Sequence, residues 1–172
     1  WLVDLDLLAS PQHVAIAQCC GPYKISVHSG SDKFKVYPIL GRICGALLHV
    51  KTAGTSYLEA LRVVARRSPA LFLEIAEYSR SRFDTDRASY HVTAELSKVP
   101  APNSLAESER ERVYLDEDWG RQILHVTFGS VLTMGQTAAG RPFKLGILEA
   151  LQINEDLHKE VLASHLGRHI ES

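Results

Sequence analysis

Apolar and polar residues alternate along residues 23–28, which is the period of a β-strand with one polar and one apolar face. The polar face ends at His28, and a turn that contains Gly and Ser, residues 29–32, follows directly. The pattern therefore predicts a strand whose last polar side chain is an imidazole beside a turn.

Two later segments have the same arrangement. Residues 45–51 carry His49 near their end and lead into a turn of Gly, Thr and Ser, and residues 121–128 carry His125 and lead into a Gly-Ser pair. We predict that these segments are the second and third strands, and that the recurring histidine marks the functional site.

Helical signals separate the predicted strands. Ser10 and Pro11 are a suitable N-cap and first helical residue. Ser56 and Glu59 have the spacing of a capping box, and Pro69 predicts a break between two helices. The predicted helices cover about residues 11–20, 33–44, 56–68, 71–82, 105–118 and 143–168, and the Val and Tyr content of 33–44 leaves a strand as the alternative there.

Strands that alternate with helices indicate an α/β fold with a parallel sheet. The strands are polar on one face, which favours a barrel. We predict a partial (β/α)8 TIM-type barrel that consists of the C-terminal βα units of the full barrel. Residues 1–172 would form a single domain of it. Residues 90–96 fit either a strand or a helix. Because the chain starts at Trp1 and has three such units, we expect it to be the C-terminal part of a longer enzyme.

Composition narrows the classes of function. Of the 172 residues 45% are apolar and 23% charged, as in soluble globular proteins, and a net charge of −1 argues against nucleic-acid binding. No apolar run approaches the roughly 20 residues of a membrane span. The 3 cysteines form no CxxC pair, which disfavours a zinc–thiolate site and fits reduced thiols in the cytoplasm.

The three strand-end histidines are candidate metal ligands, because neutral imidazole commonly binds catalytic divalent metals. At the ends of neighbouring barrel strands, His28, His49 and His125 would converge on one ion. The alternative is that each is a single histidine bonded to backbone, and without a fixed ligand spacing the residues leave both readings open. His165 and His169 are four residues apart on the last helix, but they lack an adjacent acidic partner.

Lysines and turn residues are candidate groups for an anionic substrate. Lys24, Lys33 and Lys51 are placed to orient a carboxylate or polarise a carbonyl. The turns after the first two strands precede helices, so their N–H groups are candidates to bind an anion, with ordinary capping as the alternative. The candidates at the turns and strand ends are Ser29, Gly30, Ser31, Thr52, Thr55, Thr127 and Ser130.

Four stretches of the chain carry a resemblance to a known family. They are residues 21–34 (GPYKISVHSGSDKF), 48–57 (LHVKTAGTSY), 90–92 (YHV) and 124–130 (LHVTFGS). These stretches are similar to the tagaturonate/fructuronate epimerase family of bacterial hexuronate catabolism. The resemblance covers about residues 10–170 and the C-terminal portion of the family's longer members.

The resemblance implies a TIM-barrel epimerase that depends on a divalent metal and inverts C4 of a small sugar acid. It implies His28 as a metal ligand and His49, Lys51 and His125 as residues lining the site. We predict His28 and His125 as metal ligands and Lys51, His49 and Lys24 as catalytic residues. Acidic ligands are expected outside this chain, because none stands at the end of the three predicted strands.

The expected chemistry is retro-aldol cleavage and re-addition across C3–C4, since C4 lies β to the ketone and enolisation cannot invert it. Oxidation at C4 would need a nicotinamide cofactor, and no GxGxxG follows a predicted strand. One alternative is a metal-dependent sugar aldolase or isomerase on the same barrel. Another is an inactive truncated barrel that binds a partner or forms a homo-oligomer through its open sheet edges.

Overall fold

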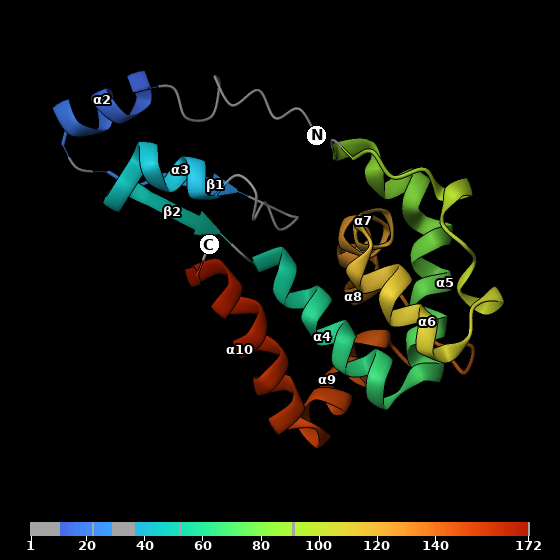
Figure 1. Ribbon diagram of the computed structural model, residues 1–172. Coiled ribbons are helices and arrows are strands. Elements are labelled where there is room, and N and C mark those ends of the chain that lie inside the picture. The colour runs from blue at the N-terminus through green and yellow to red at the C-terminus, as the bar shows by residue number, and fades with distance from the viewer. Residues whose placement is uncertain (1–10, 22, 29–36, 52, 91, 172) are drawn as a thin grey trace.

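The computed structural model describes residues 11–21, 23–28, 37–51, 53–90 and 92–171, and beside some of the gaps only the backbone. They form a small part with one pair of strands, and a larger helical part (Figure 1). No helix among these residues is long and apolar enough to cross a membrane.

The small part contains the first predicted βα unit. Helix α2 (Pro11–Cys19) begins at the predicted proline and precedes β1 (Ile25–His28). Helix α3 (Tyr37–Cys44) leads through the 3-10 turn Gly45–Leu47 to β2 (Leu48–Lys51), and the two strands are parallel. Gly45 has φ +52°, a left-handed conformation that glycine adopts easily and that ends α3. The prediction of these two strands is confirmed.

The large part is built around α4 (Ala53–Arg67), which follows β2 and packs against helices that come after it in sequence (Figure 1). The predicted break at Pro69 is confirmed, because that residue starts α5 (Pro69–Asp86). The later helices are α6 (Glu107–Glu111), a π-helical turn (Arg112–Asp116), α7 (Asp118–Val126), α8 (Phe128–Thr133), α9 (Phe143–Ile153) and α10 (Glu155–Glu171).

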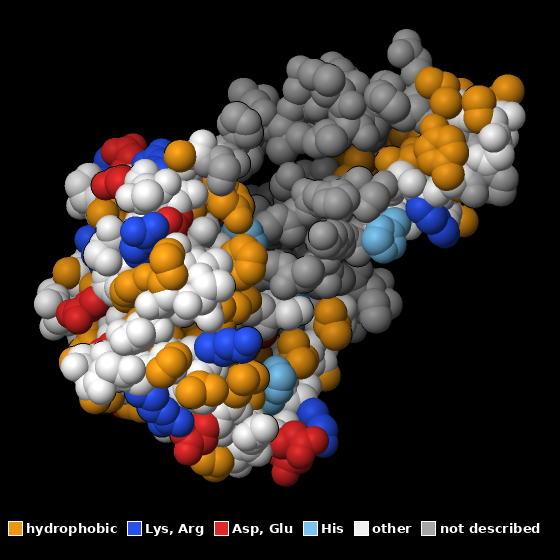
Figure 2. All heavy atoms as spheres, turned by 180° about the vertical axis from the view of Figure 1, so that it is seen from behind, with side chains coloured by type: hydrophobic (Ala, Val, Ile, Leu, Met, Phe, Trp, Pro, Cys, Tyr) orange, Lys and Arg blue, Asp and Glu red, His pale blue; other side chains and the backbone are white. Residues whose placement is uncertain are grey.

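The hydrophobic core lies between α4 and the helices around it. Leu58, Leu61 and Val64 repeat at helical spacing on the buried face of α4. They join the fully buried rings of Phe72 and Phe83 on α5. On the face seen in Figure 2, acidic and basic side chains are interspersed over the helical part, as the net charge of −1 suggests.

The predicted third strand is wrong, and so is the third βα unit that depended on it. Residues 121–128 belong to α7 and the start of α8. Gly120, Ile123, Leu124 and Thr127 are buried, and this spacing of three and four is that of a helix face. Packing against α5 and the π-helical turn outweighs the local strand preference of the sequence. The barrel itself stays a prediction, because the described residues contain one strand pair.

Three smaller predictions also need correction. Helix α4 starts at Ala53, so Ser56 lies inside it and does not cap it. The predicted final helix is two helices, and Asn154 between them bonds the carbonyl of Ala150 at 2.8 Å. Thr93 and Ala94 are neither strand nor helix, since both N–H groups donate to the Gln122 side chain at 2.9 Å.

Gly120 tests the close packing that decides the conformation of residues 118–126. A Cβ there would overlap the Val113 carbonyl oxygen and lie 2.7 Å from Tyr114 Cα. Gly120→Ala should therefore lower the free energy of unfolding by about 3 kcal/mol. Gly129→Ala is the control, because nothing lies within 4 Å of its added Cβ, and it should change stability by less than about 1 kcal/mol. Urea denaturation measures both, and equal losses would contradict the packing argument.

Candidate functional site

The carboxyl ends of the two strands bring the first two sequence motifs together. The register pairs Ser26 with His49 and His28 with Lys51, so the predicted catalytic positions of β2 lie beside the predicted metal ligand of β1. His49 is exposed. The side chains of His28 and Lys51 lie outside the described residues, as do Ser29, Gly30, Ser31, Lys33 and Thr52.

Lys24 lies away from this edge. It precedes β1, and its Nζ donates to the carbonyl of Ala46, just before β2, at 2.5 Å. In a parallel pair the two amino ends meet at one edge, and His28 and Lys51 are at the opposite one. The structure therefore separates Lys24 from the other predicted catalytic residues and gives it a contact that holds the two strand starts together.

The three hydroxyl candidates that the structure describes are buried in the helical part. Thr55 is 1% exposed in the first turn of α4, and its Oγ1 lies 3.0 Å from Nε2 of His165. Thr127 is fully buried, and its hydroxyl donates to the carbonyl of Ile123 at 2.9 Å. Ser130 is also buried, on α8. These hydroxyls are held within the protein fold.

His125 lies in a cluster of aromatic rings at the α7–α8 junction, rather than at a strand end. Its ring meets Tyr90 edge-on at 6.2 Å and stacks on Phe128 at 6.3 Å, and Phe128 lies 6.1 Å from Tyr57 of α4. We call these four residues the aromatic cluster. They come from three of the four motif stretches, so the motifs do meet in space, but through helices and a loop.

The aromatic cluster contains a phenol in an apolar setting. The Tyr57 hydroxyl is buried and has no hydrogen-bond partner among the residues that the structure describes. Burial raises the pKa of Tyr57 above its ordinary value, so the group stays protonated and remains a donor. The aromatic cluster therefore combines apolar ring faces with one hydroxyl group that can donate a hydrogen bond.

A metal centre is not complete within the described part of the chain. Across those residues, no three side chains of His, Cys, Asp or Glu form a group that could hold an ion. His125 lies on α7, so its predicted place at a strand end beside His28 is wrong. The described donor set therefore does not by itself fit a metal, and the metal stays a prediction.

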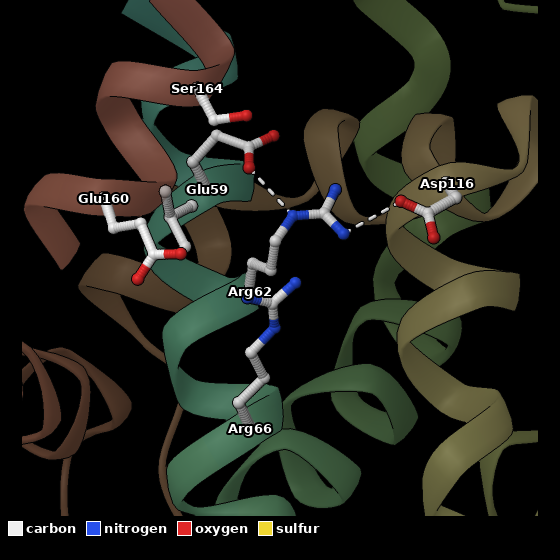
Figure 3. A pocket seen from close by; sticks show the side chains of 7 residues that line it. Glu59, Arg62, Arg66, Asp116, Glu160 and Ser164 are labelled. Carbon is white, nitrogen blue, oxygen red and sulfur yellow. Dashed lines mark hydrogen bonds and ion pairs between the residues drawn. The ribbon is translucent and has the colours of Figure 1, made fainter. Parts of the chain in front are cut away.

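A second polar region, which the sequence did not reveal, lies between α4, α10 and the π-helical turn. The pocket in Figure 3 has a volume of about 390 Å³. Its lining residues are Glu59, Arg62, Arg66, Asp116, Glu160, Val161 and Ser164.

Arg62 is the centre of this region. Its Nε donates to Glu59 at 2.8 Å, its Nη1 to Glu111 at 2.9 Å and to Asp116 at 2.8 Å, and its Nη2 to the Leu115 carbonyl at 3.1 Å. Figure 3 shows the guanidinium between carboxylates of two elements. Because these four hydrogen bonds go to acceptors on two different elements beside its own helix, Arg62 joins elements of the fold.

Charge pairing sets the protonation of this region. Burial alone would lower the pKa of Arg62, but hydrogen bonds and charge from Glu59, with bonds from Glu111 and Asp116, raise it overall. Burial would raise the pKa of Glu111, but hydrogen bonds from Arg66 and Arg62 lower it overall. In the sequence, this charge network is indicated only by the spacing of three between Glu59 and Arg62, because the other partners of Arg62 lie about fifty residues away.

Comparisons with known proteins agree on one family. The sequence profile of the tagaturonate epimerase family matches residues 6–172. The chain is 43% identical over 159 residues to the tagaturonate/fructuronate epimerase of Thermotoga maritima, covering 92% of this chain and 32% of that protein.

Solved structures give the same answer. A glycerol complex of the fructuronate-tagaturonate epimerase of Cohnella laeviribosi superposes with a TM-score of 0.83 and 37% identity, covering 94% of this chain and 32% of that one. Its native crystal structure gives a TM-score of 0.82. The chain thus spans about a third of the length of the relatives it matches.

Replacing Arg62 tests whether the buried charges stabilise the fold through pairing. Arg62→Met would leave the Glu59 carboxylate buried without its closest cation, so we expect a loss of about 3–5 kcal/mol in the free energy of unfolding. Arg67→Met, an exposed residue on the same helix, should change it by less than about 0.5 kcal/mol. Chemical denaturation at neutral pH measures both, and a loss below 1 kcal/mol for Arg62→Met would contradict the argument.

The lowered pKa of Glu111 predicts a dependence of stability on pH. A carboxyl whose pKa is lower in the folded state stabilises that state above its unfolded pKa, about 4.3 for Glu, and loses the contribution as the pH falls through the folded value. Glu111→Gln should therefore be less stable at pH 7 and lose less stability on acidification. Unfolding curves from neutral to acidic pH test this, with Glu107→Gln, on the exposed first turn of α6, as control.

Proposed function

Because this chain belongs to the tagaturonate epimerase family, we propose that the protein that carries it interconverts tagaturonate and fructuronate. The observation that carries this proposal is the family match over residues 6–172, together with the described relatives at 43% and 37% identity. Since the chain spans about a third of those relatives, the activity is proposed for the protein at its full natural length.

The substrate restricts the reaction. The two sugar acids differ at C4, which is β to the C2 ketone, so removal of the C3 proton does not invert it. A base that takes the C4 hydroxyl proton allows C4 to become an aldehyde as the C3–C4 bond breaks. The bonding electrons then pass to C2–C3 as an enolate. Rotation of the aldehyde, followed by the reverse steps, gives the C4 epimer with all atoms and electrons conserved.

The carboxyl ends of β1 and β2 are the proposed place for this reaction. His49 or Lys51 would hold the proton of the C4 hydroxyl. The register supports a shared site, because it sets Lys51 beside His28 and His49 beside Ser26. A divalent metal, for which His28 is the proposed ligand, would supply Lewis acidity at the ketone oxygen.

The substrate carboxylate has a suitable partner in the same place. Helix α4 starts directly after β2, and the first N–H groups of a helix favour an anion. We propose that the carboxylate lies at this junction, where the backbone of the motif stretch 48–57 turns into the helix.

Activity of the full natural-length protein tests the proposal. We expect it to convert tagaturonate to fructuronate, to lose activity on treatment with a chelator and to regain it with a divalent metal. NMR of the sugar acids follows both epimers. Accumulation of three-carbon fragments instead of the epimer would favour the aldolase alternative, and no turnover with any added divalent metal would reject both.

A variant at β2 tests the proposed proton transfer. His49→Gln should lower kcat by about a hundredfold or more, because an amide cannot act as a general base or acid at neutral pH. His158→Gln, on α10, is the matched control and should stay within twofold of the unaltered protein. Wild-type kcat in His49→Gln would remove His49 from the mechanism and leave Lys51→Met as the next variant.

A further inference from the structure

The last helix of the chain contacts the start of the helix that follows β2. Figure 1 shows the C-terminal end of α10 beside the beginning of α4, and the two helices pack together. The contact includes a hydrogen bond at 3.0 Å between Nε2 of His165 and Oγ1 of Thr55, two residues that are 110 positions apart. Both residues are 1% exposed.

A carboxylate lies near the other nitrogen of the His165 ring. Its Nδ1 lies 3.6 Å from Oε1 of Glu59, and the Nη1 of Arg121 is 3.8 Å from the same oxygen. The second oxygen of Glu59 accepts a hydrogen bond from Arg62 at 2.8 Å. A carboxylate near Nδ1 favours the proton on that nitrogen, which leaves Nε2 to accept the Thr55 hydroxyl. The ring thus hydrogen-bonds the first turn of α4 through Nε2 and faces the Glu59 carboxylate of the same helix with Nδ1.

Burying the polar side chains of His165, Thr55 and Glu59 lowers the stability of the fold unless their polar atoms find partners inside the protein. Apolar side chains would fill the space between α4 and α10 without that cost. Unlike apolar packing, the polar contact constrains geometry, because a hydrogen bond holds the Thr55 hydroxyl within a narrow range of distance and angle from the His165 ring of α10. Thr55 is four residues after Lys51, in the first turn of α4.

We propose that His165 is a positioning residue: through its bond to Thr55 it fixes the first turn of α4, and with it the end of β2 that carries His49 and Lys51. The inference rests on the proposed function, because it assigns His165 a role in holding the geometry of that reaction. The C-terminal helix then contributes to turnover without contacting the substrate.

The test measures kcat and KM of the full natural-length protein with tagaturonate. His165→Phe and Thr55→Val each remove the hydrogen bond, and both should lower kcat/KM about tenfold or more, mainly through kcat. The double variant should be no slower than the slower single variant, because both changes break one contact. His165→Gln can place its amide oxygen near the Nε2 position, where it accepts the Thr55 hydroxyl, and should recover most of the activity.

Controls separate positioning from stability. His158→Phe, on the same helix, should stay within twofold of the unaltered protein, and thermal unfolding gives the temperature at which every variant is folded. If His165→Phe does not fold, Thr55→Val and His165→Gln decide, since both nearly preserve side-chain volume. Variants that lose thermal stability but keep kcat/KM within twofold would overturn the proposal, as would losses that multiply in the double variant.

The proposed function and the positioning role can fail separately. Absence of turnover by the unaltered protein, with divalent metal supplied, would reject the proposed function and this inference with it. If the unaltered protein and Thr55→Val turn over the substrate equally well, the proposed epimerase function stands and only the positioning role of His165 is rejected.

Discussion

The burial of opposite charges along α4 is the constraint on which the rest of the structure depends. Glu59 is 1% exposed and Arg62 is 9% exposed, and both carry charges that water would otherwise solvate. Their partners come from α6, from the π-helical turn, from α7 and from α10. Because a buried charge without a partner is strongly destabilising, α4 can occupy the centre of the helical part only when these elements are docked on it together.

The same helix connects this charge pairing to the proposed reaction. Its first turn follows β2, so the amino end of α4 borders the strand ends with His49 and Lys51, while its middle lies among the paired charges. Tyr57, near that amino end, joins the aromatic cluster at the α7–α8 junction. Small displacements of α4 would therefore alter the strand ends, and the proposed role of the bond from His165 to Thr55 is to limit such displacements.

Part of the candidate site could be predicted from the sequence, and the rest could not. The alternation in residues 23–28 and 45–51 identified both strands, and their parallel pairing brings positions 28 and 51 side by side. Lys24 lies at the opposite end of the strand pair from His28 and Lys51, because alternation tells which face a residue shares but not which end of the strand it occupies in the sheet. His165 was recognised only as a possible partner of His169, since no local pattern points to a threonine 110 residues earlier.

The sequence by itself determined the family, the first two strands, the break at Pro69 and the helical character of residues 143–168, because these depend on local spacing, proline geometry and motif identity. Tertiary structure decided the conformation of residues 121–128. Their β-branched and apolar residues suit a strand, but Gly120 allows close contact with the π-helical turn, and burial at spacings of three and four favours the helix. It also decided which charges pair, because a buried carboxylate takes its cation from whichever element the fold brings beside it.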